Sequence, residues 1–421
     1  MNKSLLLLSY VFPPYPGIGG RRWAKFSKYL SRKGYTVHVI TAASPFKEIS
    51  QWTKDVENNP RIIRHALPPR YPSILLKQPR SLFEKISYRF QDARLKRISQ
   101  GNTYERALFW KPIMLEKAQE LIRAHSIRNV IATGAPFHLL HHSLALKKTF
   151  PDLNLIADFR DQWTDNLSFG GYRNLSASRM NFERKIESEV LQHSDCVMSV
   201  SEVITENLRK RSAGSSAAFV TLHNGFDEED FVSTPYAKRP ADNRIRFVFT
   251  GNLYDELENI VFPFLKMIAD LKKNSPVLYN KLSFSFWGNT QQKYLEFVKQ
   301  NGLNAVHFHP PVPVAKAFSE MADADYCMLF LNDDHHFTRS TKFAEYAGMK
   351  KMIVAFSNTG MLQQFLVSNK IGYACTPATM GEDFLRILTG HEKGENFFNP
   401  EFDTAAFSLP ALTDNLERLL A

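Results

Sequence analysis

The sequence is poor in cysteine and lacks any long hydrophobic run. Its 421 residues contain three widely spaced cysteines, Cys196, Cys327 and Cys375. Neither a disulfide framework nor a cysteine metal cluster is therefore expected, and a reducing compartment is favoured. No run approaches the roughly 18 apolar residues that a membrane-spanning helix needs. The apolar run at 5–8 is followed by two prolines and by no small-residue cleavage site, so it is predicted to be a buried strand and not a signal peptide.

The composition is that of a globular chain with two domains. Hydrophobic residues make up 44% of the sequence and charged residues 23%, which is enough apolar material for two cores. Apolar strands alternate with helices, and this alternation predicts parallel sheets covered on both faces. Strands are predicted at 5–9, 37–41, 130–133, 155–158, 197–200 and 219–222, and again at 246–250, 282–287, 306–309, 326–331, 352–356 and 372–375. Helices are predicted between most strands of the first half, at 21–33, 111–125, 138–148, 176–193 and 202–210.

The predicted organisation places a polar linker with two prolines at 233–243. The first domain, expected to bind the acceptor, spans 1–232 and carries a basic insertion near 61–128. The second, expected to bind the nucleotide sugar, spans 244–400, and a C-terminal helix within 401–421 packs back toward the first domain. The fold class is α/β, with two Rossmann-like domains facing an interdomain cleft. Such clefts are preferred ligand sites.

Positive charge is concentrated in one part of the chain. The net charge is +11, and residues 61–128 hold 15 Lys or Arg against 5 Asp or Glu. Apolar side chains alternate there with the cations, among them Leu75, Leu76, Leu82, Phe83 and Trp110. This pattern is typical of a segment that rests on an anionic membrane surface. Nucleic acid is a rival partner, and a solvated basic insertion is the plain alternative.

The most informative segment begins at Arg339 and reads RSTKFAEYAG. Ser340 or Thr341 can cap a helix whose start offers N–H groups and a positive dipole end to a phosphate. Arg339 and Lys342 flank that start. Glu345 follows one turn later, where its carboxylate can accept hydrogen bonds from ribose hydroxyls. The segment therefore predicts a nucleotide-diphosphate site, with an ordinary capped surface helix as the alternative.

A glycine turn follows the first strand of each predicted domain. Gly19 and Gly20 precede a helix in the first domain, and Gly251 follows the strand at 246–250 in the second. Glycines let the backbone approach an anionic ligand closely. A dinucleotide-binding fingerprint would need a third glycine where Arg22 stands, so an NAD-dependent dehydrogenase is not expected.

Several motifs together resemble GT-B-fold glycosyltransferases of family 4, which build surface polysaccharides from nucleotide sugars. In chain order they are PPYPGIGG from Pro13, GYTVHVI from Gly34, DFRDQW from Asp158, LHNGFD from Leu222 and TGNLY from Thr250. Each motif is weak alone, but their number and order span nearly the whole chain.

The resemblance implies a role for individual residues on the donor side. Gly251 and Asn252 would approach the diphosphate, and the segment HPPV from His309 to Val312 would pack against the base. Arg339 and Lys342 would neutralise the phosphates. The complete set assigned to donor binding is Gly19, Gly20, Gly251, Asn252, His309, Val312, Ser340, Thr341 and Glu345.

The sequence departs from the family pattern at one acidic position. The family carries Glu-x7-Glu, but Phe337 stands eight residues before Glu345. Nearby side chains that could replace the first Glu are Asp333, Asp334, His335 and His336. The departure keeps open a second class of function, a nucleotide-sugar-binding or scaffold protein with little activity.

Catalysis is expected to depend on protein cations. Sugar transfer releases an anionic diphosphate, which Arg339 and Lys342 would stabilise. Members of the family retain the anomeric configuration, and the leaving phosphate takes the acceptor's proton. The resemblance therefore implies no metal, no cofactor and no separate base. Arg160 and Asp161, which follow a buried strand, are also assigned to the catalytic set, and an internal ion pair that braces the loop is the alternative.

Tyr15, His138 and Trp163 are assigned to the acceptor side. His138 begins a predicted helix directly after a strand, and Trp163 can stack on a sugar or a lipid, although core packing is the default for a tryptophan. His138, His141 and His142 have helical spacing, but no acidic residue or cysteine accompanies them in that helix. A zinc site is therefore not favoured.

The sequence thus predicts a glycosyltransferase of the hexosyltransferase type, working with retention in cell-surface polysaccharide biosynthesis. Its expected partners are a nucleotide-sugar donor, a lipid-linked glycan acceptor and an anionic membrane surface, with no nucleic acid. The expected location is cytoplasmic, at the inner face of the cell membrane. The alternatives are the nucleotide-sugar-binding scaffold and, less favoured, a basic nucleic-acid-binding protein.

Overall fold

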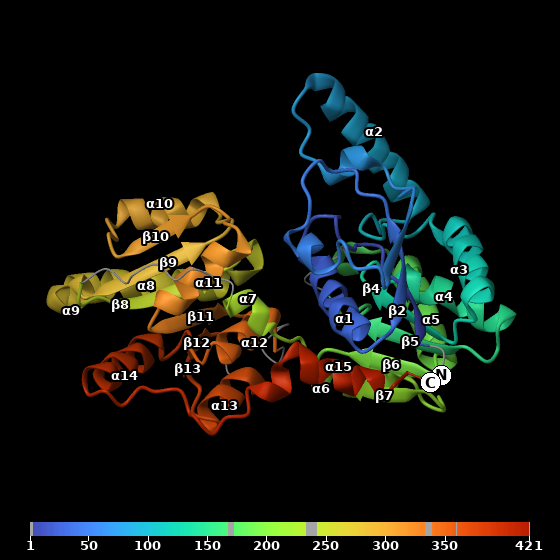
Figure 1. Ribbon diagram of the computed structural model, residues 1–421. Coiled ribbons are helices and arrows are strands. Elements are labelled where there is room, and N and C mark those ends of the chain that lie inside the picture. The colour runs from blue at the N-terminus through green and yellow to red at the C-terminus, as the bar shows by residue number, and fades with distance from the viewer. Residues whose placement is uncertain (1–2, 167–171, 233–241, 333–338, 359, 421) are drawn as a thin grey trace. The chain divides into compact units, whose positions relative to one another are not determined.

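The computed structural model describes residues 3–166, 172–232, 242–332, 339–358 and 360–420, and it contains two α/β units (Figure 1). Unit 1 comprises Met1–His223 together with Leu412–Ala421, and unit 2 comprises Asn224–Ala411. The change of unit at Asn224 comes before the linker predicted at 233–243, most of which lies outside the described residues.

Unit 1 is built on a seven-stranded parallel sheet with the order β3-β2-β1-β4-β5-β6-β7. The strands are β1 (Ser4–Leu8), β2 (Thr36–Ala42), β3 (Ile62–Leu67), β4 (Asn129–Gly134), β5 (Asn154–Phe159), β6 (Cys196–Ser199) and β7 (Ala218–Thr221). The apolar run at the N-terminus forms the interior strand β1, and Leu5 to Leu8 are fully buried in it. The prediction of a buried strand there is confirmed.

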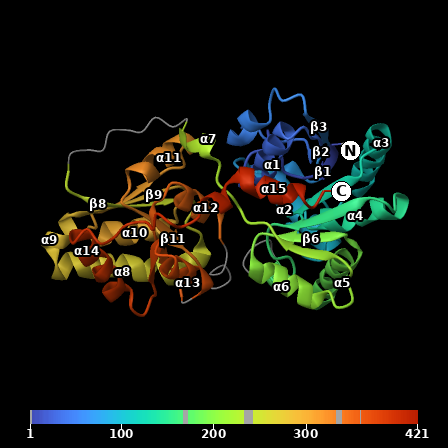
Figure 2. The ribbon, with the colours of Figure 1, turned by 60° about the horizontal axis from the view of Figure 1, so that its bottom comes forward.

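Helices cover both faces of this sheet (Figure 2). The longer ones are α1 (Arg21–Arg32), α2 (Leu82–Ile98), α3 (Lys111–His125), α4 (His138–Thr149), α5 (Ala177–His193) and α6 (Glu202–Arg211). Four short 3-10 helices also occur, η1 (Ile18–Gly20), η2 (Gln51–Asp55), η3 (Ser73–Leu76) and η4 (Tyr172–Asn174).

Unit 2 repeats the same strand order with six parallel strands, β10-β9-β8-β11-β12-β13. They are β8 (Ile245–Thr250), β9 (Leu282–Trp287), β10 (Val306–His309), β11 (Tyr326–Phe330), β12 (Met352–Phe356) and β13 (Gly372–Cys375). The helices are α7 (Glu228–Val232), η5 (Asp255–Leu257), α8 (Glu258–Asn274), α9 (Pro276–Asn280), α10 (Gln292–Gln300), α11 (Val314–Asp323), α12 (Thr341–Gly348), α13 (Met361–Ser368), α14 (Met380–Glu392) and η6 (Ala405–Phe407). Phenylalanines from neighbouring strands and from α8 pack ring against ring in its core, for example Phe264 on Phe284 and on Phe356.

The sequence located most elements of both sheets to within one or two residues, and it also located α3, but it missed β3 and α2 inside 61–128. This stretch is not a single insertion. It begins with β3, the edge strand beside β2, and its last third is α3, which packs on β1 and β2. Trp110 is fully buried and its Nε1 donates to Pro68 O at 3.0 Å. It is therefore a core residue, and its expected contact with a membrane is wrong.

The C-terminal segment completes unit 1. Helix α15 (Leu409–Glu417) lies beside α1 (Figure 2), where Lys33 pairs with Asp414 at 2.5 Å and with Glu417 at 2.9 Å. Leu412 and Leu416 are buried. The three cysteines are buried and unbridged. Among the described residues, no helix combines the length and the apolar character needed to cross a bilayer.

Because Leu416 is fully buried, Leu416→Ala should lower the free energy of unfolding of unit 1 by about 2–4 kcal/mol through a lost apolar contact and a new cavity. Urea unfolding followed by tryptophan fluorescence measures this, since four of the five tryptophans belong to unit 1. The exposed neighbour Arg418→Ala serves as control and should stay within about 0.5 kcal/mol of the parent. An equally small effect of Leu416→Ala would show that the C-terminal segment does not stabilise unit 1.

Candidate functional site

The carboxyl ends of β8 and β11 form the switch point of unit 2. These two strands are neighbours, but the chain continues from β8 toward β9 and from β11 toward β12 on the other side. Open parallel sheets bind ligands at such points. Three segments meet the edge there: the loop after β8 at 251–254, the loop after β9 at 288–289, and the start of α12.

The loops after β8 and β9 are held together by their backbones. Gly251 N donates to Trp287 O at 2.8 Å, and Leu253 N donates to Asn289 O at 2.9 Å. Gly288 has φ +149, and a Cβ placed on it would lie 2.1 Å from Gly251 O. Only glycine fits this approach. The two loops therefore form one layer at the edge of the sheet.

Asn252 fastens the same layer with its side chain. Its Oδ1 accepts hydrogen bonds from Asn289 N at 3.0 Å and from Asn289 Nδ2 at 3.1 Å. Its Nδ2 donates to Tyr254 Oη at 3.1 Å. The amide side chain thus acts inside the protein.

Helix α12 begins as the sequence predicts. Ser340 is the N-cap, and its Oγ accepts from Phe343 N at 3.3 Å, while Thr341 is the first helical residue. Buried Tyr346 places its hydroxyl 3.2 Å from Thr250 Oγ1. This contact ties the helix to the end of β8 and fixes where the helix starts.

Lys342 brings a cation to the glycine turn. A Cβ at Gly251 would lie 2.4 Å from Lys342 Cε and 2.7 Å from Nζ, so the lysine occupies the space that a side chain there would fill. Its ammonium also lies 5.2 Å from the centre of the Phe249 ring. Burial lowers the pKa of Lys342, and the carboxylate of Glu345 opposes this shift. Gly251, Lys342 and Glu345 are thus brought together.

The second expected cation, Arg339, has a different setting. Its guanidinium lies over the Phe365 ring at 4.2 Å and over the Phe407 ring at 5.9 Å. Stacking on aromatic faces orients an arginine while leaving its edge able to bind an anion.

An aromatic pair lies at the ends of β9 and β10. The rings of Trp287 and His309 stack with centres 3.9 Å apart and planes 13° apart. Lys316 Nζ lies 5.6 Å from the centre of the Trp287 ring. Val312 follows in the next loop and is half-buried. Trp287 is not among the residues predicted for the site, although a tryptophan that ends the alternating strand LSFSFW was a usable signal.

Arg160 in unit 1 is hydrogen-bonded to three backbone carbonyls. Its Nε donates to Gly134 O at 2.8 Å, its Nη2 donates to Ala135 O at 2.7 Å, and its Nη1 donates to Gly19 O. It clamps the loop after β4 to the glycine loop after β1 through backbone carbonyls. Asp161 is exposed. Arg160 is thus a positioning residue for Gly19, and its partners are not carboxylates.

The three residues assigned to the acceptor side are buried, which is the default that the sequence analysis gives for a tryptophan. Tyr15 is 2% exposed, His138 3% and Trp163 0%. The Tyr15 ring packs edge-on against Phe46 at 5.6 Å. The Trp163 ring stacks on Phe137 at 5.3 Å. The sequence could not show this burial, because aromatic residues at strand ends serve in cores and in binding sites alike.

His138 and Trp163 instead serve a buried carboxylate, Glu183. Its oxygens accept from Asn102 Nδ2 at 2.7 Å, from Trp163 Nε1 at 3.0 Å and from Arg179 Nε at 2.8 Å, and they lie 3.0 Å from His138 Nε2. Burial alone would raise the pKa of Glu183, but these hydrogen bonds and the charge of Arg179 outweigh it and lower the pKa to about 2. No local sequence pattern predicts this network.

A second buried carboxylate fills the start of α4. Glu105 accepts from Phe137 N at 2.9 Å, from His138 N at 3.1 Å and from Ala107 N at 3.1 Å. In strand order α4 is the counterpart of α12, because each helix follows the strand across the switch point of its sheet. In unit 1 the carboxylate of Glu105 thus occupies the start of α4, where an anion would otherwise be favoured. In unit 2 Lys342 lies beside the corresponding place, the start of α12.

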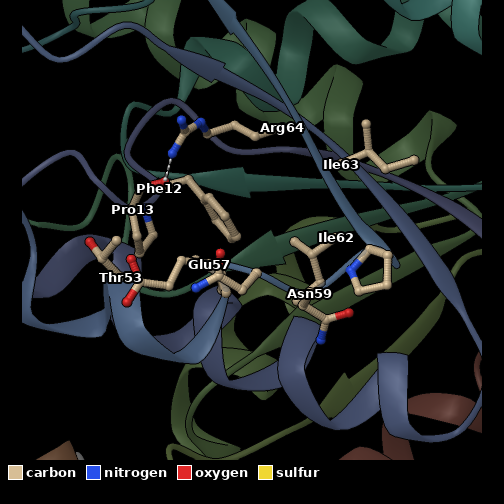
Figure 3. Close-up of a pocket in the computed structure, with 11 residues that line it drawn as sticks. Phe12, Pro13, Thr53, Glu57, Asn59, Ile62, Ile63 and Arg64 are labelled. Carbon is tan, nitrogen blue, oxygen red and sulfur yellow. Dashed lines mark hydrogen bonds between the residues drawn. The ribbon is translucent and has the colours of Figure 1, made fainter.

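Unit 1 also has a surface cavity of about 670 Å³ along the edge strand β3 (Figure 3). Its lining mixes apolar and polar side chains, including Phe12, Ile62, Glu57 and Asn59. Arg64 Nη1 donates a hydrogen bond to Pro13 O at 3.1 Å. None of the three expected acceptor residues lines this cavity.

Phe337 stands eight residues before Glu345, where the family pattern has its first Glu. Phe337 and its neighbours Asp333, Asp334, His335 and His336 lie outside the described residues.

Among the helix histidines, His141 faces Glu189 at 2.9 Å and His142 donates to Ala107 O at 3.1 Å. His138, His141 and His142 therefore have three separate partners.

Comparison with known proteins defines the class of fold. The sequence matches no protein-family model and no curated protein. Solved structures match 99% of the chain. Sucrose-phosphate synthase from Thermosynechococcus elongatus does so with 14% identity, a TM-score of 0.67 and 98% of its own chain covered. WaaG, a glycosyltransferase involved in lipopolysaccharide biosynthesis, does so with 10% identity, a TM-score of 0.61 and 99% covered.

An epimerase shares the same fold. UDP-GlcNAc 2-epimerase from Neisseria meningitidis, solved with UDP-GlcNAc bound, matches 99% of the chain with 12% identity, a TM-score of 0.53 and 99% of its own chain covered. At such identities the likeness establishes the fold. The chain therefore has the GT-B fold of these glycosyltransferases and of the epimerase, as its motifs predict.

The buried histidines of unit 1 make its stability depend on pH. Burial lowers the pKa of His142 to about 3 and that of His38 to about 4. The unfolded chain therefore binds more protons between about pH 4 and 6.5, and the free energy of unfolding should fall as pH drops through this window, by up to about 1.4 kcal/mol per pH unit for each histidine. His142→Gln should reduce the slope of the free energy of unfolding against pH by the contribution of one proton. Urea unfolding measured at several pH values tests this.

The matched control is Ser143→Ala, which changes a buried neighbour without a titrating group. It should keep the full slope. An unchanged slope in His142→Gln would mean that His142 does not contribute to the pH dependence.

Proposed function

We propose that this protein is a glycosyltransferase that moves a sugar from a nucleotide-diphosphate donor to a glycan acceptor. The observation that carries the proposal is the meeting of the Gly251 turn, the start of α12 and the ammonium of Lys342 at the switch point of unit 2. Backbone N–H groups, a helix start and a cation at one edge suit a diphosphate. The GT-B fold supports the same class, because the chain shares it with glycosyltransferases.

The proposed donor lies across this edge. Gly251 and Asn252 offer backbone to the diphosphate, with Lys342 as the nearest cation and Arg339 as the second. Ser340 and Thr341 present the helix start. Glu345 accepts from the ribose hydroxyls. The Trp287–His309 pair, with Val312 beside it, provides the apolar surface for the base.

The chemistry follows from the charges. As the glycosidic bond to the donor breaks, negative charge grows on the diphosphate, and a cation already in place stabilises it without reorganisation. We propose that no metal or other cofactor takes part. The leaving phosphate accepts the acceptor's proton, and the anomeric configuration is retained. Gly19 and Gly20 of unit 1 are also proposed to bind the donor, and Arg160 holds their loop through Gly19 O.

For the acceptor we propose a lipid-linked glycan of cell-surface polysaccharide biosynthesis, used at the inner face of the cell membrane. Two observations support this choice. One neighbour in fold is involved in lipopolysaccharide biosynthesis. Residues 61–128 of unit 1 have a surplus of cations, with 15 Lys or Arg against 5 Asp or Glu.

The decisive experiment for the class of reaction begins with thermal shifts. UDP, GDP, TDP, CMP and their sugars are screened, and a ligand selective for the folded state should raise the melting temperature. The best donor is then incubated with lipid-linked glycans, and the products are separated. Transfer of the sugar supports the proposal. A donor sugar whose stereochemistry has changed would mean that the protein is an epimerase. Binding of a donor without turnover would mean that it is a scaffold. If no nucleotide raises the melting temperature, the proposed donor site is refuted.

Glu345→Gln should weaken binding of the donor by about 1.5–3 kcal/mol, because a hydrogen bond to a charged acceptor is lost. Calorimetric titration with the donor from the screen measures this. Glu401→Gln, an exposed carboxylate change in the same unit, is the control and should bind as the parent does. Unchanged affinity in folded Glu345→Gln would remove Glu345 from the site.

Lys342→Met should lower kcat by about 100-fold and affect donor binding less, since charge on the leaving diphosphate grows in the transition state. Methionine keeps an unbranched side chain along Gly251 and removes only the charge. Lys299→Met, at an exposed position, is the matched control. Equal losses of affinity and rate would mean that Lys342 only anchors the bound donor.

A further inference from the structure

Helix α2 carries an apolar stripe on the side that faces away from the protein. Phe83 is 85% exposed, Leu82 73%, Phe90 67% and Ile86 59%. Leu82, Ile86 and Phe90 follow one another at intervals of four, so they share one face of the helix, and Phe83 lies beside them. The opposite face holds buried Leu95 and half-buried Tyr88. The helix is thus apolar on both sides, and only one side is covered.

Cations flank the uncovered stripe. The helix contains five of them, Lys85, Arg89, Arg94, Lys96 and Arg97, against the two carboxylates Glu84 and Asp92. Both carboxylates are engaged within the helix or at its start. Glu84 accepts from Arg80 N and Ser81 N at its cap, and Asp92 pairs with Lys96 at 2.7 Å. An exposed apolar stripe with a basic rim is the pattern of a helix that lies in a membrane interface.

The segments that flank α2 are hydrogen-bonded within unit 1, while the apolar stripe of the helix is exposed. Figure 1 shows α2 at the end of unit 1, away from the strands, and its main packing partner is η3. Tyr71 before the helix donates its hydroxyl to Thr103 O after it, at 2.8 Å. Beyond Thr103, Glu105 fastens the chain to the start of α4. The segments that flank the helix are therefore joined to each other and anchored to unit 1.

The segment that leads into α2 starts from the carboxyl edge of the unit 1 sheet. Pro69 O accepts from Tyr10 Oη at 2.8 Å, and Tyr10 follows the end of β1. The same edge carries the glycine loop and Arg160. A surface that covers the stripe of α2 would thus lie on the side of unit 1 where the loops after β1 and β5 begin.

We propose that the stripe of Leu82, Phe83, Ile86 and Phe90 docks into the interface of an anionic phospholipid bilayer, with Lys85, Arg89 and Arg94 at the headgroups. This deepens the proposed function, because it names the surface through which a lipid-linked acceptor is reached. The aromatic and aliphatic side chains enter the boundary between headgroups and acyl chains, while the cations remain among the phosphates.

Other occupants fit the surface less well. A second copy of the chain would bring an equally basic rim against this one, and like charges would oppose the contact. Nucleic acid would be attracted by the cations, but its phosphates would not bury the four exposed apolar side chains of the stripe. Both occupants remain as outcomes of the test.

The test is flotation of the full chain with neutral and anionic phospholipid vesicles at about 0.02 M and about 0.5 M salt, because screening weakens charge attraction. The parent should float with anionic vesicles at low salt and much less with neutral ones. F83E/F90E should lower the vesicle partition coefficient at least about tenfold. K85Q/R89Q should lower binding to anionic vesicles and reduce its salt dependence.

The matched control is V277E/F397E, which places the same charges on exposed apolar residues of unit 2, 75% and 67% exposed in the parent. It should float as the parent does. Circular dichroism and melting temperature confirm that each variant is folded. Thermal shifts with the donor, measured without vesicles, should be the same in the parent and in F83E/F90E, so loss of docking and loss of the donor site are separate results.

Several results would overturn the proposal. The parent could stay in solution with anionic vesicles at low salt, float equally with neutral ones, or float undiminished in F83E/F90E. A dimer that F83E/F90E converts to monomer, without any change in flotation, would assign the stripe to a second copy. Oligonucleotide binding that F83E/F90E abolishes, with no flotation by the parent, would assign it to nucleic acid.

Discussion

The site in unit 2 depends on the close approach of two glycine backbones. Gly288 comes so near to Gly251 that a Cβ on Gly288 would meet Gly251 O at 2.1 Å. Because neither residue has a side chain, the turns after β8 and β9 can merge into one layer, which Asn252 and Asn289 then fasten. The same absence of a side chain at Gly251 leaves the space that Lys342 occupies. One steric constraint thus places backbone, helix start and cation at one edge.

The two units use the same topology for opposite purposes. In both, a helix follows the strand across the switch point, and its start favours negative charge. Unit 1 satisfies its helix α4 with Glu105, whose carboxylate is buried and hydrogen-bonded to three backbone N–H groups. Unit 2 instead brings Lys342 to the start of α12, and the burial of this ammonium lowers its pKa. This asymmetry is why we place the anionic donor in unit 2.

The sequence predicted the elements that local patterns control. Alternating apolar strands and helices gave both sheets, and the RST segment gave a cap that the structure assigns to Ser340. Burial was harder to predict. Arg160, His138 and Trp163 look like ligand-binding residues in a motif, yet each is engaged by protein groups from distant segments. Such long-range pairings have no local signal, and the same holds for Glu105 and Glu183. Helix α2 was hidden because its exposed apolar residues disturb the usual helical periodicity.

The most direct measurement of the central claim is hydrogen–deuterium exchange of the full chain, with and without the nucleotide diphosphate that stabilises it most. The account predicts slower exchange in three segments of unit 2, the turn at 251–254, the loop at 288–289 and the start of α12 at 340–345, with little change at the Glu105-filled start of α4. Protection confined to unit 1, or none at the Gly251 turn under saturating nucleotide, would contradict it.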